Sequence, residues 1–447
     1  MAVYGVASGI NSYNRTRSQY PYLWIASPVF FCVPLAVMEI HHRIYSKKHV
    51  EFDRPLTTMS ETEFYAITRK GRRHLLLLDD LVLDATDYAP YHPGGKFIIE
   101  RCRGTDVSKF FYGGYNLEPK TNGINYNHTN YARLACNSLI IGKLDRGVDT
   151  AMVQIADSHI CSGGDYRDIR TFKFAPVAGK GLSPLTQRHY PISWTGKHYL
   201  IQEVTKDGQH VGKIRHYTVS NCLARDQYED YCQALEAAIE SGKLVKRLNP
   251  ALFKEEPAEH FSLTLKAYWN VNGFSQRLFD SFMADDRATF EVKGPMGKSL
   301  GIKMSGHHIA FGAGTGGITF MDTAAWCARL VMGELSEEET AMVADDFKFT
   351  FFFTYFNEDQ SQGLRMLKAL QAVCEKFGNK HFELRLRDSS KKSPRWDQKF
   401  LDANLPPTCE KLWICGTPVM NEVFEDAFHK LSPKFPYLKD LEVVQVL

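Results

Sequence analysis

A tetrapeptide of one histidine, one proline and two glycines most constrains what this chain can fold into. It spans His92 to Gly95, and His128 is the only histidine between His92 and His159. Proline fixes its own φ, so the histidine leaves the backbone at a turn, and the glycines let another group approach the main chain closely. The pattern favours a site where an imidazole meets a flat porphyrin, that is, a haem site. The alternative is an ordinary surface turn.

The residues around this tetrapeptide predict a small mixed domain. Two short apolar runs, Leu75–Leu78 and Leu81–Leu83, bracket an Asp79-Asp80 turn and predict a pair of strands. Helical spacing follows over Lys96–Arg103, and the segment 104–108 has the composition of a cap for a further helix. Two strands followed by short helices predict an α+β fold.

From about Glu61 to Leu144 the chain resembles a cytochrome b5 domain, on the segments DATDYAPYHPGGKFI, GTDVSKFF and HTNYARLACNSLIIGKL. The resemblance implies a b-type haem with His92 and His128 as its axial ligands. Iron held by two imidazoles has no open position, which favours one-electron transfer over oxygen binding. The stretch Gly113–Asn127 is longer than the family's usual link between the ligands. Outside this context, His128 would be read as a surface histidine.

Three further motifs follow the segment that resembles a cytochrome b5 domain. Arg215 and Tyr217 share one face of a strand-like run, where arginine can bind a pyrophosphate and tyrosine can lie against a flavin ring. A second apolar run leads into the glycine-rich loop 312–317 and then into an apolar helix, an arrangement that directs amide groups at phosphate. A third strand ends in Cys415, where a nicotinamide could meet a flavin. Taken alone, Cys415 would be read as a buried apolar residue.

In this order the motifs resemble the ferredoxin-NADP reductase superfamily, particularly its cytochrome b5 reductase and nitrate reductase branches. The match covers roughly Pro184 to Leu447, with Trp194–His198 as an early barrel strand and Phe261–Lys266 as the strand before the pyrophosphate loop. It implies an antiparallel FAD-binding β-barrel and a doubly wound α/β domain for NADH or NADPH. The implied catalytic residues are Tyr217, Thr218 and Cys415. The implied cofactor-binding residues are Arg215, Tyr217, Thr218, Gly273, Phe274, Ser275, Gly312, Gly314, Thr315, Gly316, Cys415 and Gly416.

The chain departs from the reductase pattern in several places. Its glycine-rich loop carries an extra glycine in Gly316-Gly317, and Phe320 stands where the family has proline. Val271-Asn272 replaces a pair of glycines, and Thr417 stands where proline is common. A segment with helical spacing, Leu223–Pro257, interrupts the barrel. Most of these departures fall in the segments expected to bind the nucleotide. They therefore leave open the alternative that the nucleotide loop no longer supports turnover.

Together the motifs predict an electron path from NAD(P)H through FAD to haem and on to an external acceptor. Nicotinamide delivers two electrons as hydride, a b-type haem accepts one at a time, and a flavin can do both. The expected partner is a redox protein or a set of neighbouring membrane subunits. One alternative is an accessory subunit of a membrane respiratory complex that keeps the reductase fold without turnover. Another is a haem or flavin sensor, for which the sequence offers no specific support.

The N-terminal segment predicts attachment to a membrane. Ser18–Met38 carries no charge and is long enough to cross a bilayer, although Pro21, Pro28 and Pro34 interrupt it. The alternative is an apolar arm packed on a partner subunit. The first 38 residues contain no acid, and serine and arginine recur in them, a composition that slightly favours a mitochondrial membrane over the endoplasmic reticulum.

Charge and cysteine content exclude other classes. The formal net charge of +3 is too small to indicate nucleic-acid binding, and the 10 cysteines are scattered without paired spacing, as reduced thiols are. The length suits about three domains. We expect five parts: an apolar segment at 1–50, a cytochrome b5-like haem domain at 51–145, a linker at 146–183, an FAD-binding barrel at 184–302 and an NAD(P)-binding domain at 303–447.

Overall fold

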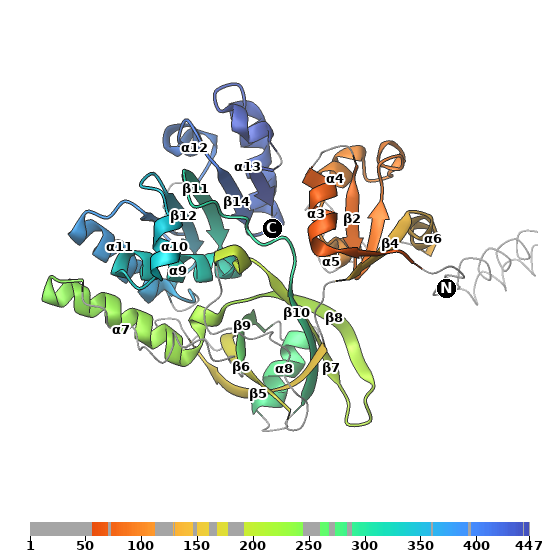
Figure 1. Cartoon of the computed structure of the whole chain (residues 1–447), viewed down its shortest axis with the longest axis horizontal. Coiled ribbons are helices and arrows are strands. Elements are labelled where there is room, and N and C mark those ends of the chain that lie inside the picture. The colour runs from red at the N-terminus through yellow and green to blue at the C-terminus, as the bar shows by residue number, and fades with distance from the viewer. Residues whose placement is uncertain are drawn as a thin grey trace, which may run out of the picture.

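The structure is a computed structural model. It describes residues 56–69, 73–111, 128, 130–145, 150–160, 168–177, 192–244, 260–267, 273–283, 288–358, 361–391, 395–440 and 442–446. Their strands form three sheets of four, six and five strands, and Figure 1 shows one sheet in each of three bodies. The fold class expected from the sequence is therefore confirmed for the three globular parts.

The first body is the α+β domain around the histidine turn. Its strands are β1 (Thr58–Ser60), β2 (Leu75–Leu78), β3 (Leu81–Asp84) and β4 (Ile140–Asp145), in the sheet order β1-β4-β3-β2. Its helices are α3 (Glu61–Arg69), η1 (Ala89–Tyr91), α4 (Lys96–Arg101), α5 (Ser108–Phe111) and α6 (Asn130–Ser138). The predicted pair of strands around Asp79-Asp80 and the two predicted helices are confirmed.

The leucines of β2 explain why this small sheet is covered on both faces. Successive side chains of a strand point to opposite faces. Leu75 and Leu77 accordingly pack in one cluster with Phe64 of α3, whereas Leu76 and Leu78 pack in another with Ile99 of α4. The continuous apolar run therefore forms a strand that is buried on both sides.

The second body is an antiparallel barrel. Its strands are β5 (Thr150–His159), β6 (Ile169–Pro176), β7 (His198–Val204), β8 (His210–Thr218), β9 (Phe261–Lys266) and β10 (Thr289–Met296), in the order β8-β7-β10-β5-β6-β9. A single antiparallel bridge between Val219 and Leu263 joins the end of β8 to β9 and so closes the sheet on itself. The core is aromatic: Phe174 stacks on Phe261 with ring centroids 5.1 Å apart.

Two predictions about the start of the barrel are wrong. The stretch 146–183 is not an interdomain linker, because β5 and β6 lie within it and pair with β10 and β9. Ala151 and Val153 are buried at alternate positions of β5, as a half-buried strand requires. Trp194–His198 is also not a strand: Ile192–Trp194 forms the 3-10 helix η2, and β7 begins only at His198.

The third body is a parallel sheet with helices on both faces. Its strands are β11 (His307–Ala313), β12 (Lys348–Tyr355), β13 (Phe382–Asp388), β14 (Lys411–Cys415) and β15 (Val444–Val446), in the order β13-β12-β11-β14-β15. Its helices are η6 (Gly314–Phe320), α9 (Met321–Met332), α10 (Glu337–Met342), α11 (Leu364–Phe377), α12 (Gln398–Asn404), α13 (Pro418–Leu431) and η8 (Pro436–Lys439).

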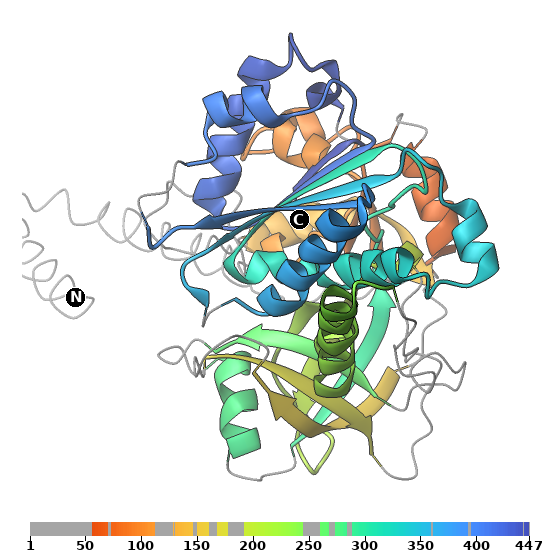
Figure 2. The ribbon, with the colours of Figure 1, turned by 90° about the vertical axis from the view of Figure 1, so that its left-hand side faces the viewer.

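The strands of this sheet are apolar on both faces, as in other doubly wound folds. In β12, Phe351 and Phe353 pack in one cluster with α9 and α11, whereas Phe352 packs in the other with α12 and α13. Figure 2 shows these helices above and below the sheet. The predicted doubly wound domain is therefore confirmed.

The helix predicted within the insertion after the flavin motif is also confirmed. α7 (Arg225–Ser241) lies between β8 and β9 and packs on α11 of the parallel-sheet domain. Arg365 of α11 donates hydrogen bonds of 2.7 Å to both carboxylate oxygens of Glu236 and one of 3.0 Å to Glu229, both on α7. The inserted helix thus holds the barrel against the parallel-sheet domain.

A buried carboxylate makes a second contact between these two bodies. Asp322, in the first turn of α9, accepts hydrogen bonds from the backbone amides of Asn221 (3.3 Å) and Cys222 (2.9 Å) in the segment after β8. Burial raises the pKa of Asp322 above its ordinary value, even though these hydrogen bonds oppose the shift. The end of β8 is therefore tied directly to the helix that follows the glycine-rich loop.

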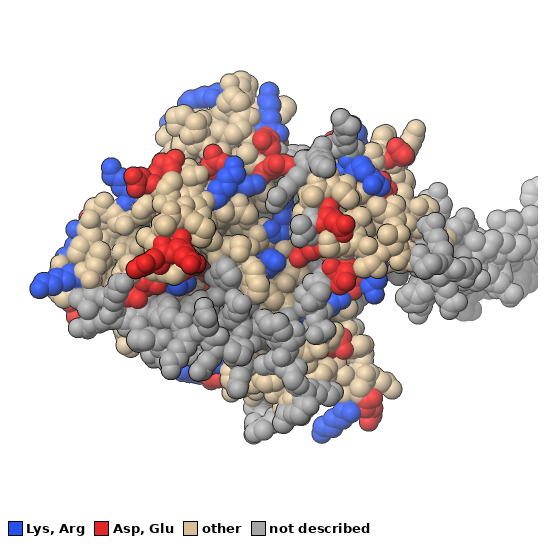
Figure 3. All heavy atoms as spheres, in the orientation of Figure 1, with Lys and Arg blue, Asp and Glu red and all other residues tan. Residues whose placement is uncertain are grey.

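The predicted apolar segment at 1–50, including Ser18–Met38, lies outside the described residues. Among the residues that the structure does describe, no helix has the length and apolar character needed to span a bilayer. On the face drawn in Figure 3, acidic and basic side chains are interspersed rather than gathered into a field of one sign.

Candidate haem, flavin and nucleotide sites

His92 stands at the tight turn between η1 and α4. Its ring Nδ1 lies 3.3 Å from the carbonyl oxygen of Gly95. Gly95 has a φ of 95°, a conformation that favours glycine. At Gly94, an added Cβ would lie 2.9 Å from both His92 Cε1 and Ile98 Cδ1. Both glycines are thus required by the turn that presents the imidazole.

His128 is held by the last residue of α5. Its ring Nδ1 lies 3.0 Å from the carbonyl oxygen of Phe111, and the two rings stack with centroids 4.5 Å apart and an interplanar angle of 14°. Residues 112–127, which include the expected long loop, lie outside the described residues. Among the described residues, Phe111 at the end of α5 thus contacts the His128 ring through both its carbonyl oxygen and its side chain.

The two histidines fit the chemistry of haem ligands. A carbonyl oxygen can only accept a hydrogen bond, so Nδ1 carries the proton in each ring and Nε2 keeps its lone pair. Metal-bound histidines in proteins characteristically donate their other ring N–H to a backbone carbonyl or a carboxylate. The nearby segment also carries Cys136, and burial raises the pKa of its thiol to about 12, as for a buried structural cysteine.

The flavin motif lies on β8 as the sequence predicts. β8 pairs with β7 in a register that places Arg215 opposite Ile201 and Tyr217 opposite Tyr199. Cross-strand partners share a face, so Arg215 and Tyr217 lie on one face of β8. Thr218 lies on the other face, opposite His198.

The predicted pyrophosphate loop leads into α8 (Phe274–Met283). The side chain of Phe274 is buried in the barrel core, where its ring contacts Tyr217 with centroids 5.9 Å apart. Only the backbone of Phe274 is therefore available to a ligand. Ser275 is also buried, whereas a Cβ added at Gly273 would meet nothing within 4 Å. The neighbouring Val271-Asn272 lies outside the described residues.

The nucleotide motif lies at the point where the parallel sheet reverses its strand order. β12 and β13 extend the sheet from one side of β11, and β14 and β15 extend it from the other. Ligands of such sheets bind outside the carboxyl ends of the strands at this switch point. β11 ends at Ala313 and β14 ends at Cys415, with Gly312 paired to Cys415. The structure thus brings the two predicted nucleotide elements together.

Within the glycine-rich loop, packing leaves no room for a side chain at two of the glycines but leaves open space at a third. At Gly316, an added Cβ would lie 2.2 Å from the carbonyl oxygen of Cys415. At Gly317, it would lie 2.4 Å from the ring of Phe353. Gly314 is exposed, and a Cβ there would meet nothing within 4 Å. The extra glycine is therefore explained by packing, and Gly314 with the half-buried Thr315 forms the open part of the loop.

Three other motif residues are placed by packing around the same loop. An added Cβ at Gly416 would lie 2.6 Å from Met420 Sδ. The half-buried Cys415 has its Sγ 3.5 Å from Thr319 Oγ1. Phe320 is fully buried, and its ring meets Phe351 edge to face at 5.4 Å. Phe320, which departs from the proline of the reductase pattern, thus packs in the hydrophobic core of the parallel-sheet domain.

The haem domain contacts the barrel through polar groups that the sequence analysis did not single out. Lys293 Nζ of β10 lies 2.7 Å from an Asp80 carboxylate oxygen, and the Gly297 amide donates to Glu61 at 3.2 Å. Asp106 approaches His198 and His216 across the same interface. Arg101 of α4 contacts the parallel-sheet domain instead, through an ion pair with Glu425 of α13. No local signal could reveal these pairs, because the partners are distant in sequence.

Comparison with known proteins supports the first of these assignments. The model of the family described as cytochrome b5-like heme/steroid binding domain matches residues 58–145. This confirms the resemblance for that part of the chain, about a fifth of its length. No curated protein matches the sequence.

Solved structures with some similarity are flavin and haem enzymes. The ferredoxin-NADP+ reductase of Plasmodium falciparum is 13% identical, with a TM-score of 0.40 over 67% of this chain and 95% of that one. The flavohemoglobin of Malassezia yamatoensis with bound FAD and heme is 11% identical, with a TM-score of 0.38 over 67% and 59%. A type IV self-sufficient cytochrome P450 monooxygenase is 13% identical, with a TM-score of 0.40 over 66% and 28%. This chain thus spans about a quarter of the monooxygenase.

These low TM-scores add nothing to the topology, which rests on the strands themselves. The chain combines a domain of the cytochrome b5-like family with an antiparallel barrel and a doubly wound parallel sheet. The last two follow in the order that the sequence analysis expects, with the antiparallel barrel before the doubly wound domain.

Proposed function

We propose that this chain is an oxidoreductase that transfers electrons from NADH or NADPH through FAD to a bis-histidine b-type haem, and from there to an external acceptor. One observation carries the proposal. His216 lies between Arg215 and Tyr217, the two expected flavin contacts on β8, and one of its ring nitrogens lies within 4.8 Å of an Asp106 carboxylate oxygen in the haem domain. The haem domain is therefore docked on the strand that carries the flavin motif.

Each part of the path has its own residues in this proposal. His92 and His128 would hold the iron through Nε2, while their Nδ1–H groups would stay on backbone carbonyls. Arg215 would bind the flavin pyrophosphate, and Tyr217 and Thr218 would position the ring. A flavin accepts hydride and releases electrons singly, which the haem requires.

On the nucleotide side, Gly314 and Thr315 would face the dinucleotide phosphates at the switch point between β11 and β14. Cys415, at the end of β14, would flank the nicotinamide. The hydrogen bonds of Asp322 to the segment after β8 hold this side close to the end of the flavin strand. Hydride transfer needs such closeness, because the donor and acceptor atoms must be in contact.

The acceptor and the location extend the proposal on sequence grounds alone. A haem with both axial positions filled would supply one-electron transfer, so the acceptor would be a redox protein or a neighbouring subunit. We propose membrane attachment through Ser18–Met38, with a mitochondrial membrane slightly preferred over the endoplasmic reticulum. An accessory subunit without turnover is the competing hypothesis.

Anaerobic rapid mixing tests the proposal. The purified protein, loaded with FAD and haem, should show bleaching of the flavin absorbance on addition of NADH or NADPH, followed by the bands of reduced haem. The matched control is His92→Ala, in which the flavin should bleach while no low-spin haem is present to be reduced. Retention of both cofactors without bleaching by either nucleotide would contradict the proposal and favour the accessory subunit.

Arg215→Ala should weaken flavin retention by about tenfold or more, because a charge-assisted hydrogen bond to phosphate is worth about 1.5–3 kcal/mol. The measurement is the ratio of flavin to protein after gel filtration at matched dilution. The control is Arg225→Ala. Arg225 is an exposed arginine shortly after β8, and its Nε lies 3.0 Å from Asp157 Oδ2 in an ion pair. Equal flavin content in the two variants would count against a pyrophosphate role for Arg215.

A further inference from the structure

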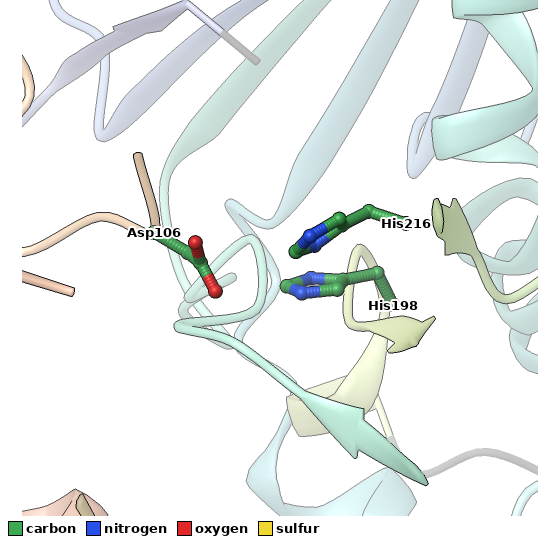
Figure 4. A group of neighbouring side chains, drawn as sticks. All are labelled: Asp106, His198 and His216. Atoms are coloured by element: carbon green, nitrogen blue, oxygen red, sulfur yellow. The ribbon is translucent and has the colours of Figure 1, made fainter. Parts of the chain in front are cut away.

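Three side chains meet where the haem domain touches the barrel, and we call them the interface triad: Asp106, His198 and His216. Each is half-buried, and one ligand atom from each lies within 4.8 Å of those of the other two. Figure 4 shows the two imidazole rings side by side, with their tips directed at the Asp106 carboxylate. Asp106 belongs to the haem domain, whereas the histidines lie on β7 and β8 of the barrel.

Asp106 is held rigidly by its own domain. Its backbone makes a parallel bridge to Leu77 of β2, with flanking hydrogen bonds from Leu77 N to Thr105 O (3.0 Å) and from Val107 N to Leu77 O (2.8 Å). Its carboxylate Oδ1 accepts hydrogen bonds from the amide (3.0 Å) and hydroxyl (2.6 Å) of Ser108. Such an orienting contact around a carboxylate is typical of metal ligands.

The two histidines are held by the barrel. His198 pairs with Thr218 and His216 pairs with Leu200, so both lie on the face of the β7–β8 pair that carries Thr218. Their rings are 5.1 Å apart between centroids, tilted by 39°. The main chain at Gly297 supports the His198 ring so closely that an added Cβ would lie 3.0 Å from Nδ1 and Cε1.

The charges around the triad suit a cation, because one of its three ligands is a carboxylate. Around the triad, Lys293 is paired with Asp80 and Lys197 lies 3.9 Å from Glu61. These nearby lysines already have acidic partners.

We propose that the interface triad binds one divalent cation of the zinc type and so clamps the haem domain onto the barrel. Two imidazole nitrogens and one carboxylate oxygen are ligands that Zn²⁺ commonly has in three-ligand sites, with water in a fourth position. Ca²⁺ and Mg²⁺ prefer sites made of oxygen alone. Tetrahedral ligands at zinc distances lie about 3.3 Å apart, so binding would draw the 4.8 Å group together by about 1.5 Å at most.

The position gives the clamp a consequence for electron transfer, and this consequence alone rests on the proposed function. Asp106 lies five residues before Phe111, whose carbonyl holds His128, and His216 lies beside Tyr217 of the flavin motif. A cation at the triad would thus fix the separation between the two expected redox sites while touching neither. Metal binding itself is independent of whether any nucleotide is oxidised.

Zinc binding to the chelator-treated holoprotein tests the site, with haem loaded so that His92 and His128 are occupied. Calorimetric titration with Zn²⁺ should give one site per chain, and zinc analysis after desalting should give the same stoichiometry. X-ray absorption at the zinc edge, which iron does not obscure, should show two imidazoles and a carboxylate. Asp106→Asn and His216→Ala should each weaken binding by about tenfold or more.

The matched control is His210→Ala, which removes an exposed histidine at the other end of β8, 3.3 Å from Glu291. It should bind zinc as the unchanged protein does. Absence of stoichiometric zinc in the unchanged protein, or equal affinity in all three variants, would overturn the proposal. Two variants from different domains guard against a loss caused by local misfolding of either one. A further outcome is that the unchanged protein binds no zinc while the variants hold the haem domain less tightly on the barrel. That result would show that the triad is a contact between charged side chains, and it would also overturn the proposal.

Discussion

Replacement of either His92 or His128 by alanine is expected to abolish the low-spin spectrum of six-coordinate haem. Each ring has its Nδ1 on a backbone carbonyl, so removing a ring removes one Nε2 and leaves the iron with an open position. The double variant should retain no tightly bound haem. The measurement is the absorbance spectrum of oxidised and reduced protein after reconstitution with equal amounts of haem.

The control for these variants is His429→Ala, an exposed histidine in the last turn of α13. It should have the spectrum of the unchanged protein. An unaltered six-coordinate spectrum in the His128 variant would mean that the second ligand is misassigned. The family description also covers steroid binders, and a protein that takes up no haem with both histidines intact would point to that class instead.

Gly316→Ala is expected to destabilise the parallel-sheet domain strongly. The added methyl group would lie 2.2 Å from the carbonyl oxygen of Cys415 and 2.6 Å from its carbonyl carbon, so the glycine-rich loop and β14 would have to separate. Overpacking of this kind costs about 1–3 kcal/mol or more, which lowers the melting temperature of a domain of this size by about 5–10 °C. Thermal unfolding followed by circular dichroism measures the shift.

Gly314→Ala is the matched control within the same loop. Gly314 has a φ of 55° but open space around it, so alanine there costs only about 1 kcal/mol of backbone strain. A smaller shift than for Gly316→Ala is therefore expected. If the two variants melt at the same temperature, the close approach of the loop to Cys415 does not contribute to stability.

The order of the motifs was predictable because each motif depends on neighbouring residues. Proline and two glycines define the turn at His92, and a period of two places Arg215 and Tyr217 on one face of a strand. The glycine-rich loop between an apolar strand and an apolar helix predicts a turn at the end of β11 and the helix α9 after it, although not the 3-10 helix η6 that forms within the loop. For such features the chain needs no information from distant residues.

The barrel's first strands were missed for an equally local reason. Gly163-Gly164 and Gly179–Gly181 suggested a linker, but β5 ends at His159 and β6 runs from Ile169 to Pro176, so the glycines lie outside both strands. The strand character of β5 is carried by alternate small and apolar residues, such as Ala151 and Val153. The glycines therefore indicated turns more strongly than the flanking residues indicated strands. The strands that pair with β5 and β6, namely β10 and β9, lie far along the chain.

Phe320 and Gly317 show how packing changes the meaning of a departure from a family pattern. Read along the sequence, both residues suggested a nucleotide loop that had lost its function. In the structure, Phe320 fills the core beside Phe351, and Gly317 leaves space for Phe353. Neither departure therefore counts against nucleotide binding at Gly314 and Thr315.

By itself the sequence determined the class of each domain and the strands on which the expected flavin and nucleotide residues lie, because these depend on short-range patterns of apolar residues, glycine and proline. The two histidines of the first domain stay predicted ligands. Only the tertiary structure decided how the domains meet. Asp106 comes within 4.8 Å of His198 and His216 because separate hydrogen-bonded strands position them across the interface. Residues about 100 positions apart come together only through packing, so no periodicity or spacing in the sequence predicts their proximity.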